Sequence, residues 1–474
     1  MKQSKYLLFL LIAITIGACK KSFLEVTDNS NINRQAYVKD LNSLQEFMNG
    51  VYLMLSAKYE QGSEEAYPGL IADELKVSSI STPLAMHNNW SQVKDAIQAA
   101  NFTSMNLSWM NYYNIIRACN FVIENVGKYT SENPDKGNSI KGQALAIRAM
   151  IHLRLVNIFA QNYSFTADAS HSGIPYITTS DITKAYSRQT VAEVYQNMIT
   201  DLEAAIPLMP IKVSDTRYMN APAAKALLAR IYLYKEDFVK AKSLSIELIS
   251  QHPLMSINAG YPVDMFKYKQ QPEQTEVLFQ ITPITNDYAS SDFIGIYFVI
   301  DYFRATADIA TILMENTKDP RRSWVTQSGG NWMVTKFPAG VAGGLAYDPS
   351  IDYYVPVVRS SEMFLTAAEA SAKTNDETNA RLYLNAIRKR ADPTIADIVV
   401  GGPALLDSIC KERRKEFCFE GFRMWDLQRW KLAVQRTDVV DGFQKTLPYP
   451  SEKAIAPIPG QDVNLMGLNQ NPGY

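Results

Sequence analysis

Three glutamates near the end of the chain could do acid–base chemistry. Glu412, Glu416 and Glu420 recur at four-residue intervals within KERRKEFCFEGFRMWDLQRW (411–430). Two carboxylates that face each other across a glycosidic bond can hydrolyse it, one as acid and one as nucleophile. The four-residue interval stacks these side chains along one face of a helix instead. Hydrolysis by Glu416 or Glu420 therefore remains an alternative and is not the favoured interpretation.

The same stretch carries an arginine on an apolar helix face. Pro403 can begin this helix and Gly421 can end it as the C′ residue. A buried guanidinium without a carboxylate partner costs several kcal/mol, so Arg413 must find one. Asp426 follows directly after the turn. The stretch predicts a structural ion-pair clamp between two successive helices, made by Arg413, Glu416, Glu420 and Asp426.

Other chemistries lack a motif in this sequence. The chain of 474 residues has a formal charge of −1, whereas nucleic-acid binding requires a basic excess. G-x-S-x-G, H-E-x-x-H and P-loop motifs are absent. The four histidines are scattered, and no cysteine spacing suggests a metal site. We predict no cofactor, no metal and no catalytic residue.

Aromatic residues offer a different chemistry. Tyr, Phe and Trp make up 11% of the chain. An aromatic ring stacks on the apolar face of a sugar, while neighbouring amides bind its hydroxyls. Trp90 follows Asn89 in the polar loop LAMHNNW (84–90), and Tyr288 and Tyr297 lie in a segment without helical period. The predicted ligand-binding residues are Asn89, Trp90, Tyr288 and Tyr297.

The elements that must position these residues are mostly helices. Apolar residues at steps of three and four predict helices over 41–55, 105–126, 141–163 and 190–210. Residues 221–253 fit a tetratricopeptide repeat, with small residues where two helices approach. Such helix pairs stack into a solenoid.

Two later segments differ in character. Residues 364–391 predict a second helical pair joined by a polar turn. Between the pairs, residues 254–358 form a loop-rich insert in which TEVLFQITP and WMVTKF alternate like strands. The final segment, 456–474, is predicted not to be helical and to form either a loose tail or an extended strip on the core. We therefore predict an all-α, tetratricopeptide-like scaffold with an irregular insert.

The N-terminus has the pattern of an export signal. Two lysines precede a charge-free run, Tyr6–Ala18, which is too short to span a bilayer. The run ends in IGAC, the pattern of a bacterial lipobox, in which Cys19 carries the lipid. We predict a lipoprotein signal peptide over residues 1–18 and a polar tether over 20–35.

Short motifs in order along the chain resemble those of the SusD/RagB family of surface nutrient-binding lipoproteins. They begin with CKKSFLEV, NGVY and ADEL, and continue with GQALAIRA and DPRR. RSSEMFLTAAEA, ERRKEFCFEGFRMWDLQRW and the closing PIP…NQNPGY complete the series. The resemblance extends over nearly the whole chain.

This resemblance implies a SusD-like fold and a binding function without catalysis. Members of the family lie on the outer face of the outer membrane and bind glycans, or sometimes peptides. They act as the lid of a SusC-like TonB-dependent transporter. By position, Trp90 with Asn89 and Tyr288 with Tyr297 match the family's ligand-site aromatics.

The expected organisation has four parts. The signal peptide (1–18) precedes an N-terminal SusD-like region (19–220), a helical repeat pair (221–253) and a C-terminal SusD/RagB region (254–474). Three alternatives remain: an exported glycoside hydrolase, a peptide-binding member of the same family, and a helical-repeat adaptor that recognises another envelope protein.

Overall fold

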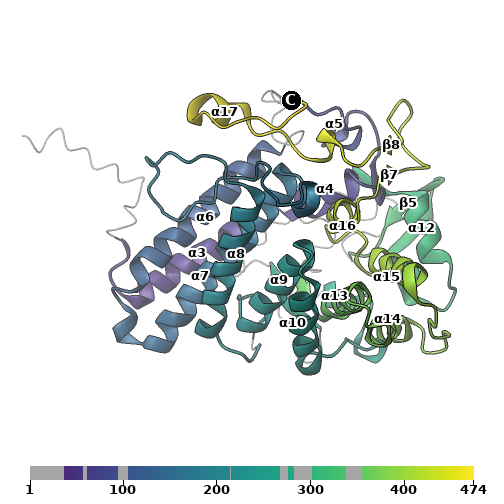
Figure 1. Ribbon diagram of the computed structural model, residues 1–474, viewed down its shortest axis with the longest axis horizontal. Coiled ribbons are helices and arrows are strands. Elements are labelled where there is room, and N and C mark those ends of the chain that lie inside the picture. The colour runs from purple at the N-terminus through teal and green to yellow at the C-terminus, as the bar shows by residue number, and fades with distance from the viewer. Residues whose placement is uncertain are drawn as a thin grey trace, which may run out of the picture.

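Helices make up most of the structure (Figure 1). The computed structural model describes residues 37–56, 61–93, 105–213, 215–266, 276–281, 301–337 and 355–474. The N-terminal helices are α3 (Leu41–Leu55), α4 (Gln61–Leu70), α5 (Ala85–Asn88), α6 (Asn106–Val126), α7 (Pro134–Phe159) and α8 (Val191–Ala205). The later helices are α9 (Ala221–Tyr234), α10 (Phe238–Gln251), α12 (Ala307–Met314), α13 (Ser360–Lys373), α14 (Glu377–Ala391), α15 (Gly402–Phe417), α16 (Arg423–Arg429) and α17 (Gly460–Met466).

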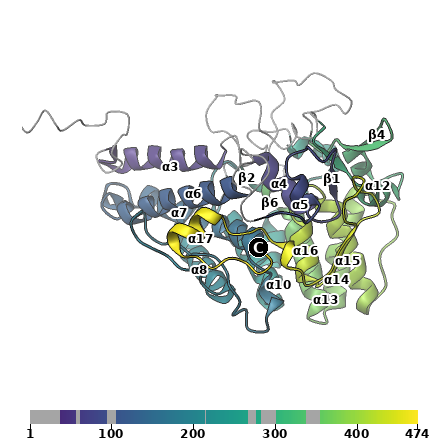
Figure 2. The ribbon, with the colours of Figure 1, turned by 90° about the horizontal axis from the view of Figure 1, so that it is seen from above.

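The three helices α6, α7 and α8 pack side by side in sequence order (Figures 1 and 2). The helices expected over 41–55, 105–126 and 190–210 are present as α3, α6 and α8. The helix expected over 141–163 begins earlier, because Asn133 caps it and Pro134 occupies its first position. It ends at Phe159, so residues 160–163 are not part of it.

Two helical pairs form the repeat scaffold that the sequence predicts. Helices α9 and α10 pack together, as do α13 and α14, and α10 also packs on α13. The small residues Ala229 and Ala241 are fully buried. The pairs therefore stack as successive repeats, and the prediction of an all-α, tetratricopeptide-like scaffold is confirmed.

Short strands connect distant parts of the chain. The strands are β1 (Leu75–Val77), β2 (Val277–Ile281), β3 (Phe303–Ala305), β4 (Val325–Ser328), β5 (Asn331–Val334), β6 (Val355–Arg359), β7 (Val434–Gln435) and β8 (Thr446–Leu447). An antiparallel sheet has the order β1-β3-β5-β4, and β2 pairs with β6. Strands β2 and β5 lie in the two segments that alternate in the sequence. The insert is thereby joined to the N-terminal region through β1.

The C-terminal segment crosses the helical scaffold as an extended strip (Figure 2). The Ala456 N–H donates to the Ile158 carbonyl at 2.7 Å, and Asn471 Nδ2 donates to the Phe159 carbonyl at 2.9 Å. At the end of the chain, Gln92 Nε2 donates to the Tyr474 hydroxyl at 2.7 Å. The strip is therefore bonded at both of its ends to α7 and to Gln92, which lie far earlier in the sequence.

The expectation that residues 456–474 contain no helix is wrong. Helix α17 occupies Gly460–Met466 within the strip. It begins after Pro459 and ends where Gly467 adopts a left-handed conformation with φ of 67°. These are the ordinary proline-start and glycine-end signals of a short helix.

The helix of the glutamate cluster is also shorter than expected. Helix α15 ends at Phe417, four residues before Gly421. The chain turns at Phe419, whose φ is 68° and whose N–H donates to Glu74 Oε2 at 3.1 Å. Gly421 is still required for the turn, because its φ is 83°.

Two helical glycines give a test of this packing. A Cβ on Gly142 in α7 would lie 2.6 Å from Met209 Cγ and 2.9 Å from the Ala205 carbonyl. Gly142→Ala is therefore expected to lower the free energy of unfolding by about 1–3 kcal/mol. At Gly50 in α3, nothing lies within 4 Å of the added Cβ, so Gly50→Ala is expected to raise it by about 0.5–1 kcal/mol. Urea denaturation of both variants measures the difference, and equal effects would contradict the packing described.

Candidate functional site

Arg413 and Asp426 form one half of the buried ion-pair system around α15. Arg413 Nε donates to Asp426 Oδ2 at 2.8 Å, and Arg429 Nε donates to Asp426 Oδ1 at 2.9 Å. Arg429 also binds both oxygens of Glu369 on α13. The Arg413 side chain is fully buried, and its guanidinium lies 5.3 Å from the centroids of two phenylalanine rings. This half joins α15 to α16 and both to the repeat scaffold.

Glu416 is the centre of the other half. Its carboxylate accepts hydrogen bonds from Arg359 (2.6 Å), Arg390 (2.7 Å), Arg321 (2.8 Å) and the Tyr261 hydroxyl (3.0 Å). Burial alone would raise the pKa of Glu416, but these three guanidiniums hold it well below its usual range. Glu416 is therefore a permanently ionised group without access to substrate.

Cationic side chains also bind Glu420 inside the fold. Its Oε1 accepts from Lys336 Nζ at 2.6 Å and from Arg359 Nη2 at 2.8 Å, and its side chain is 1% exposed. The partners of Glu416 and Glu420 come from the insert, from β6 and from α14. Among the described residues, these two glutamates therefore do not join α15 to α16, as the predicted clamp required; Arg413 and Asp426 do. The sequence identified the carboxylates but not these partners, because they lie 26 to 155 residues away. A glycosidase acid or nucleophile at either position does not fit this arrangement.

Two buried arginines differ in how many carboxylates depend on them. Arg359 pairs with three buried carboxylates, those of Glu276, Glu416 and Glu420, and shares them with Arg390, Arg321 and Lys336. Arg413 pairs with Asp426, which also binds Arg429.

Replacement of these two arginines by methionine is a test of that difference. Arg359→Met is expected to cost about 3–5 kcal/mol or to prevent folding, because it removes from three buried carboxylates the one positive charge that they share. Arg413→Met is expected to destabilise less, because two of its guanidinium nitrogens have no hydrogen-bond partner among the described residues. Thermal unfolding followed by circular dichroism measures both, with the exposed Arg322→Met as control. A larger loss at Arg413 would contradict this ranking.

The loop with the predicted sugar-binding residues packs against the C-terminal segment. Trp90 is 2% exposed, its Nε1 donates to the Ile71 carbonyl at 2.9 Å, and the Arg436 guanidinium lies 3.9 Å from its ring centroid. The half-buried Asn89 accepts the Gln444 N–H at 2.8 Å. In this structure, the Trp90 ring offers no open face to a sugar, because the indole is used as a core side chain.

Three other predicted residues lie outside the described residues. These are the lipid-attachment residue Cys19 and the ligand-site tyrosines Tyr288 and Tyr297. Among the residues that are described, Cys119, Cys410 and Cys418 are free thiols. No group of three or more metal-ligating side chains occurs in the described part of the chain.

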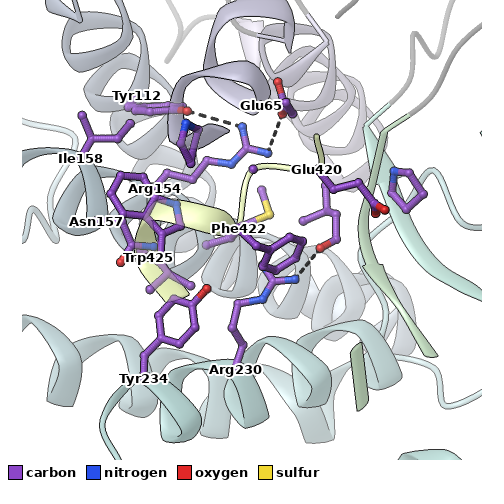
Figure 3. A pocket seen from close by; sticks show the side chains of 16 residues that line it. Glu65, Tyr112, Arg154, Asn157, Ile158, Arg230, Tyr234, Glu420, Phe422 and Trp425 are labelled. Carbon is purple, nitrogen blue, oxygen red and sulfur yellow. Dashed lines mark hydrogen bonds and ion pairs between the residues drawn. The ribbon is translucent and has the colours of Figure 1, made fainter. Parts of the chain in front are cut away.

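A pocket lies where α4, α6, α7, α9, β6 and α16 meet (Figure 3). We call it the Arg154 pocket; its volume is about 90 Å³. Its lining residues are Glu65, Pro68, Tyr112, Met150, Leu153, Arg154, Asn157, Ile158, Arg230, Tyr234, Pro356, Val357, Glu420, Gly421, Phe422 and Trp425. The turn after α15 forms part of its wall, so the ion-pair system supports this pocket without lining most of it.

Charged side chains project into the pocket from opposite sides (Figure 3). Arg154 Nη2 lies 3.3 Å from Glu65 Oε1, and its Nη1 donates to the Tyr112 hydroxyl at 3.4 Å. Across the pocket, Arg230 forms two hydrogen bonds of 2.6 Å with Glu362. The two guanidiniums therefore differ in the closeness of their carboxylate partners.

Aromatic side chains complete the wall. Phe422 lies under the Arg230 guanidinium, with 4.9 Å between the ring centroid and Cζ. Burial raises the pKa of Tyr234 to about 12, so its hydroxyl remains a neutral donor. Trp425 is 9% exposed. Rings beside polar groups that donate and accept hydrogen bonds are the chemistry that recognises sugars.

The sequence did not single out this pocket. Its residues come from six elements, so no local motif contains them. One signal was present: Arg154 and Asn157 interrupt the mostly apolar last turns of α7, and Arg230 does the same in α9.

Glu65 is the group in the pocket whose charge changes near neutral pH. Burial raises its pKa to about 7, and the nearby Arg154 only partly offsets this effect. Its pKa in the unfolded chain is about 4.3. The native state therefore holds the proton more tightly. The stability that Glu65 contributes is complete below about pH 4.3 and is lost as the pH rises through about 7.

Glu65→Gln tests this linkage, because glutamine cannot ionise. Relative to the unmodified protein, the variant is expected to gain about 1–3 kcal/mol of stability between pH 5 and pH 8. Urea unfolding at both pH values measures the change, with the exposed Asp407→Asn as control. A pH-independent difference would show that Glu65 does not titrate in this range.

Two family models match the chain in succession. A model described as "Starch-binding associating with outer membrane" matches residues 22–233, and one described as "SusD family" matches residues 310–474. The chain belongs to the SusD family. A SusD-like protein from Formosa agariphila is 25% identical to it over the full length of both chains.

Solved structures of SusD-like proteins have the same fold. A SusD superfamily protein from Bacteroides thetaiotaomicron aligns with a TM-score of 0.80 at 25% identity, over 92% of this chain and 100% of that one. Surface glycan-binding protein A from the same species has a TM-score of 0.65 at 19% identity, over 91% and 99% of the two chains. The family is associated with the outer membrane. Within the described residues, no helix has the length and apolar character needed to cross a membrane.

Proposed function

We propose that this protein is a surface-exposed outer-membrane lipoprotein that binds an oligosaccharide nutrient and delivers it to a SusC-like TonB-dependent transporter. It serves as the lid of that transporter and performs no catalysis. The observation that carries the proposal is the succession of the starch-binding model and the SusD model along one chain. Cys19, after the apolar run, is the proposed site of lipid attachment.

The buried ion pairs support a binding role. Glu416 and Glu420 carry the charges that a hydrolase would need, but guanidinium and ammonium groups bind them inside the fold. Tyr288 and Tyr297 remain the proposed ligand contacts of the insert. Trp90 acts, in this proposal, by fixing the loop that carries Asn89.

Titration with a panel of neutral and acidic oligosaccharides tests the binding role. We expect at least one glycan to bind, and Tyr288→Ala or Tyr297→Ala to weaken a neutral glycan at least tenfold without changing thermal stability. Trp90→Ala is expected to lower stability by about 3–5 kcal/mol, since the indole is buried. Binding of peptides and of no glycan would favour a peptide-binding function instead.

Two further measurements separate the remaining alternatives. Chromatography of the incubated panel is expected to show no product; product that disappears in folded Glu416→Gln would establish a hydrolase. Pull-down from detergent-solubilised membranes is expected to recover a large β-barrel transporter. Recovery of a different envelope protein alone would favour the adaptor.

A further inference from the structure

A second pocket lies on the helical scaffold, where the first half of α15 meets the C-terminal ends of α9, α13 and α16 (Figure 1). We call it the Trp430 pocket; its volume is about 350 Å³. This volume falls within the range of roughly 300–1,000 Å³ that is usual for ligand pockets, whereas the Arg154 pocket, at about 90 Å³, is smaller. The Trp430 pocket is therefore the larger candidate for a ligand site on the scaffold.

Trp430 forms an aromatic wall whose orientation is fixed. Its Nε1 donates to Glu369 Oε1 at 2.9 Å, and the Arg429 guanidinium lies 4.7 Å from its ring centroid. Glu369 and Arg429 bind each other and are 1% and 5% exposed at their side chains, so this pair is not free for a ligand. The indole is half-buried, and its one donor is already bonded. It therefore offers apolar ring surface to the pocket.

The other apolar walls come from two further helices and the chain after α16. Phe238 begins α10, and Leu406 and Cys410 lie one turn apart on α15. These three residues are half-buried, and Leu432, which follows α16, is 51% exposed. Partly exposed apolar surface around a pocket of this size is typical of a site that binds another molecule.

Four exposed charged side chains also line the pocket, two of each sign. Glu236 and Asp407 are acidic, and Lys373 and Lys431 are basic. None of the four side chains forms a hydrogen bond or an ion pair among the described residues; Lys373 Nζ lies 6.0 Å from the Phe238 ring centroid. Their charges cancel, so this rim offers carboxylate acceptors and ammonium donors without a net attraction for a charged ligand.

The helix ends at the pocket disfavour an anion. Leu233 and Lys373 lie in the last turns of α9 and α13, and Arg429 is the last residue of α16. The C-terminal end of a helix carries a partial negative charge. A ligand that brings hydroxyl donors is therefore better suited to this pocket than one that brings a carboxylate or a phosphate.

We propose that the Trp430 pocket binds a neutral oligosaccharide, with the C–H face of one sugar against the Trp430 ring and its hydroxyls on the rim charges. A pyranose has an apolar face, no charge, and hydroxyls that both donate and accept, which matches these walls and this rim. Starch, named in the description of the family model that matches residues 22–233, is a neutral glycan. The inference rests on the proposed glycan-binding function and adds a site built on residues other than Tyr288 and Tyr297.

Protection of Cys410 from alkylation reports whether this pocket is occupied. Cys410 lines the pocket, whereas Cys119 and Cys418 are fully buried. Burial raises the pKa of the Cys410 thiol, so its reaction with iodoacetamide at about pH 8.5 is expected to be slow enough to follow by hand. Mass spectrometry of the tryptic peptide 391–411 measures the label at this position.

The probes are maltohexaose, cellohexaose, mannohexaose and xylohexaose, with trigalacturonate and trileucine as comparisons. We expect at least one of the four neutral glycans to slow the alkylation of Cys410, and neither comparison to do so. The glycan concentration that halves the rate gives the affinity at this pocket. Calorimetry with the same probes measures binding to the whole protein.

Three variants test the wall and the rim. Trp430→Ala is expected to weaken protection about tenfold, and Trp430→Phe is expected to lose less, because it keeps a ring. Asp407→Ala removes an exposed acceptor that the fold does not use, so it is expected to weaken protection and leave thermal stability unchanged. Asp441→Ala, an exposed residue that does not line the pocket, is the matched control. Circular dichroism establishes that each variant is folded.

The outcomes separate this inference from the proposed function. If a neutral glycan binds and Cys410 is not protected, or if Trp430→Ala and Asp407→Ala leave protection unchanged, the inference fails and the proposed function stands. Protection by trileucine or trigalacturonate, and by none of the neutral glycans, would show that the ligand class is wrong. Tyr288→Ala is expected to leave protection unchanged, and a loss would show that the two sites are not separate. If no glycan binds at all, both proposals fail.

Discussion

Glu416 is a fully buried carboxylate that three arginines surround, and the placement of much of the chain depends on this contact. Removing a charge from water costs several kcal/mol unless close partners replace the lost hydration. The partners of Glu416 come from the insert (Arg321), from the end of strand β6 (Arg359) and from helix α14 (Arg390). Each of these segments must be in place before the charge is compensated. The network therefore fixes their relative positions more strictly than apolar contacts would, since apolar contacts tolerate sliding.

This constraint explains how a stretch rich in carboxylates and guanidiniums can have a structural role and no catalytic one. The carboxylates and guanidiniums of α15 and α16 are bound to each other and to the repeat helices. The turn that follows α15 then presents Gly421 and Phe422 to the Arg154 pocket. In that pocket Arg154 lies 3.3 Å from Glu65, and Glu65 Oε2 has no donor among the described residues.

The sequence predicted those features that depend on neighbouring residues. The spacing of apolar residues predicted the positions of α3, α6 and α8 closely, and the repeat pattern predicted α9 and α10. Both patterns depend only on neighbouring residues. Features set by distant contacts were not predictable. Helix α15 ends early because Glu74, more than 300 residues away, receives the Phe419 N–H. The polar loop around Trp90 predicted a ring that stacks on a sugar. In the structure, the indole is buried, because it bonds the Ile71 carbonyl and packs against the Arg436 guanidinium. The Arg154 pocket combines six elements, and only isolated polar residues on apolar helices indicated it.

The bonds of the C-terminal strip have a consequence for the order in which the protein matures. Residues of the C-terminal strip form hydrogen bonds with Gln92 and with the carbonyls of Ile158 and Phe159. These three residues lie about 300 positions or more earlier in the sequence. These groups gain their partners within the protein only after residues 456–474 have been synthesised. Until then, the two carbonyls at the C-terminal end of α7 bond to water, so the last turn of this helix gains its packing partners late in folding.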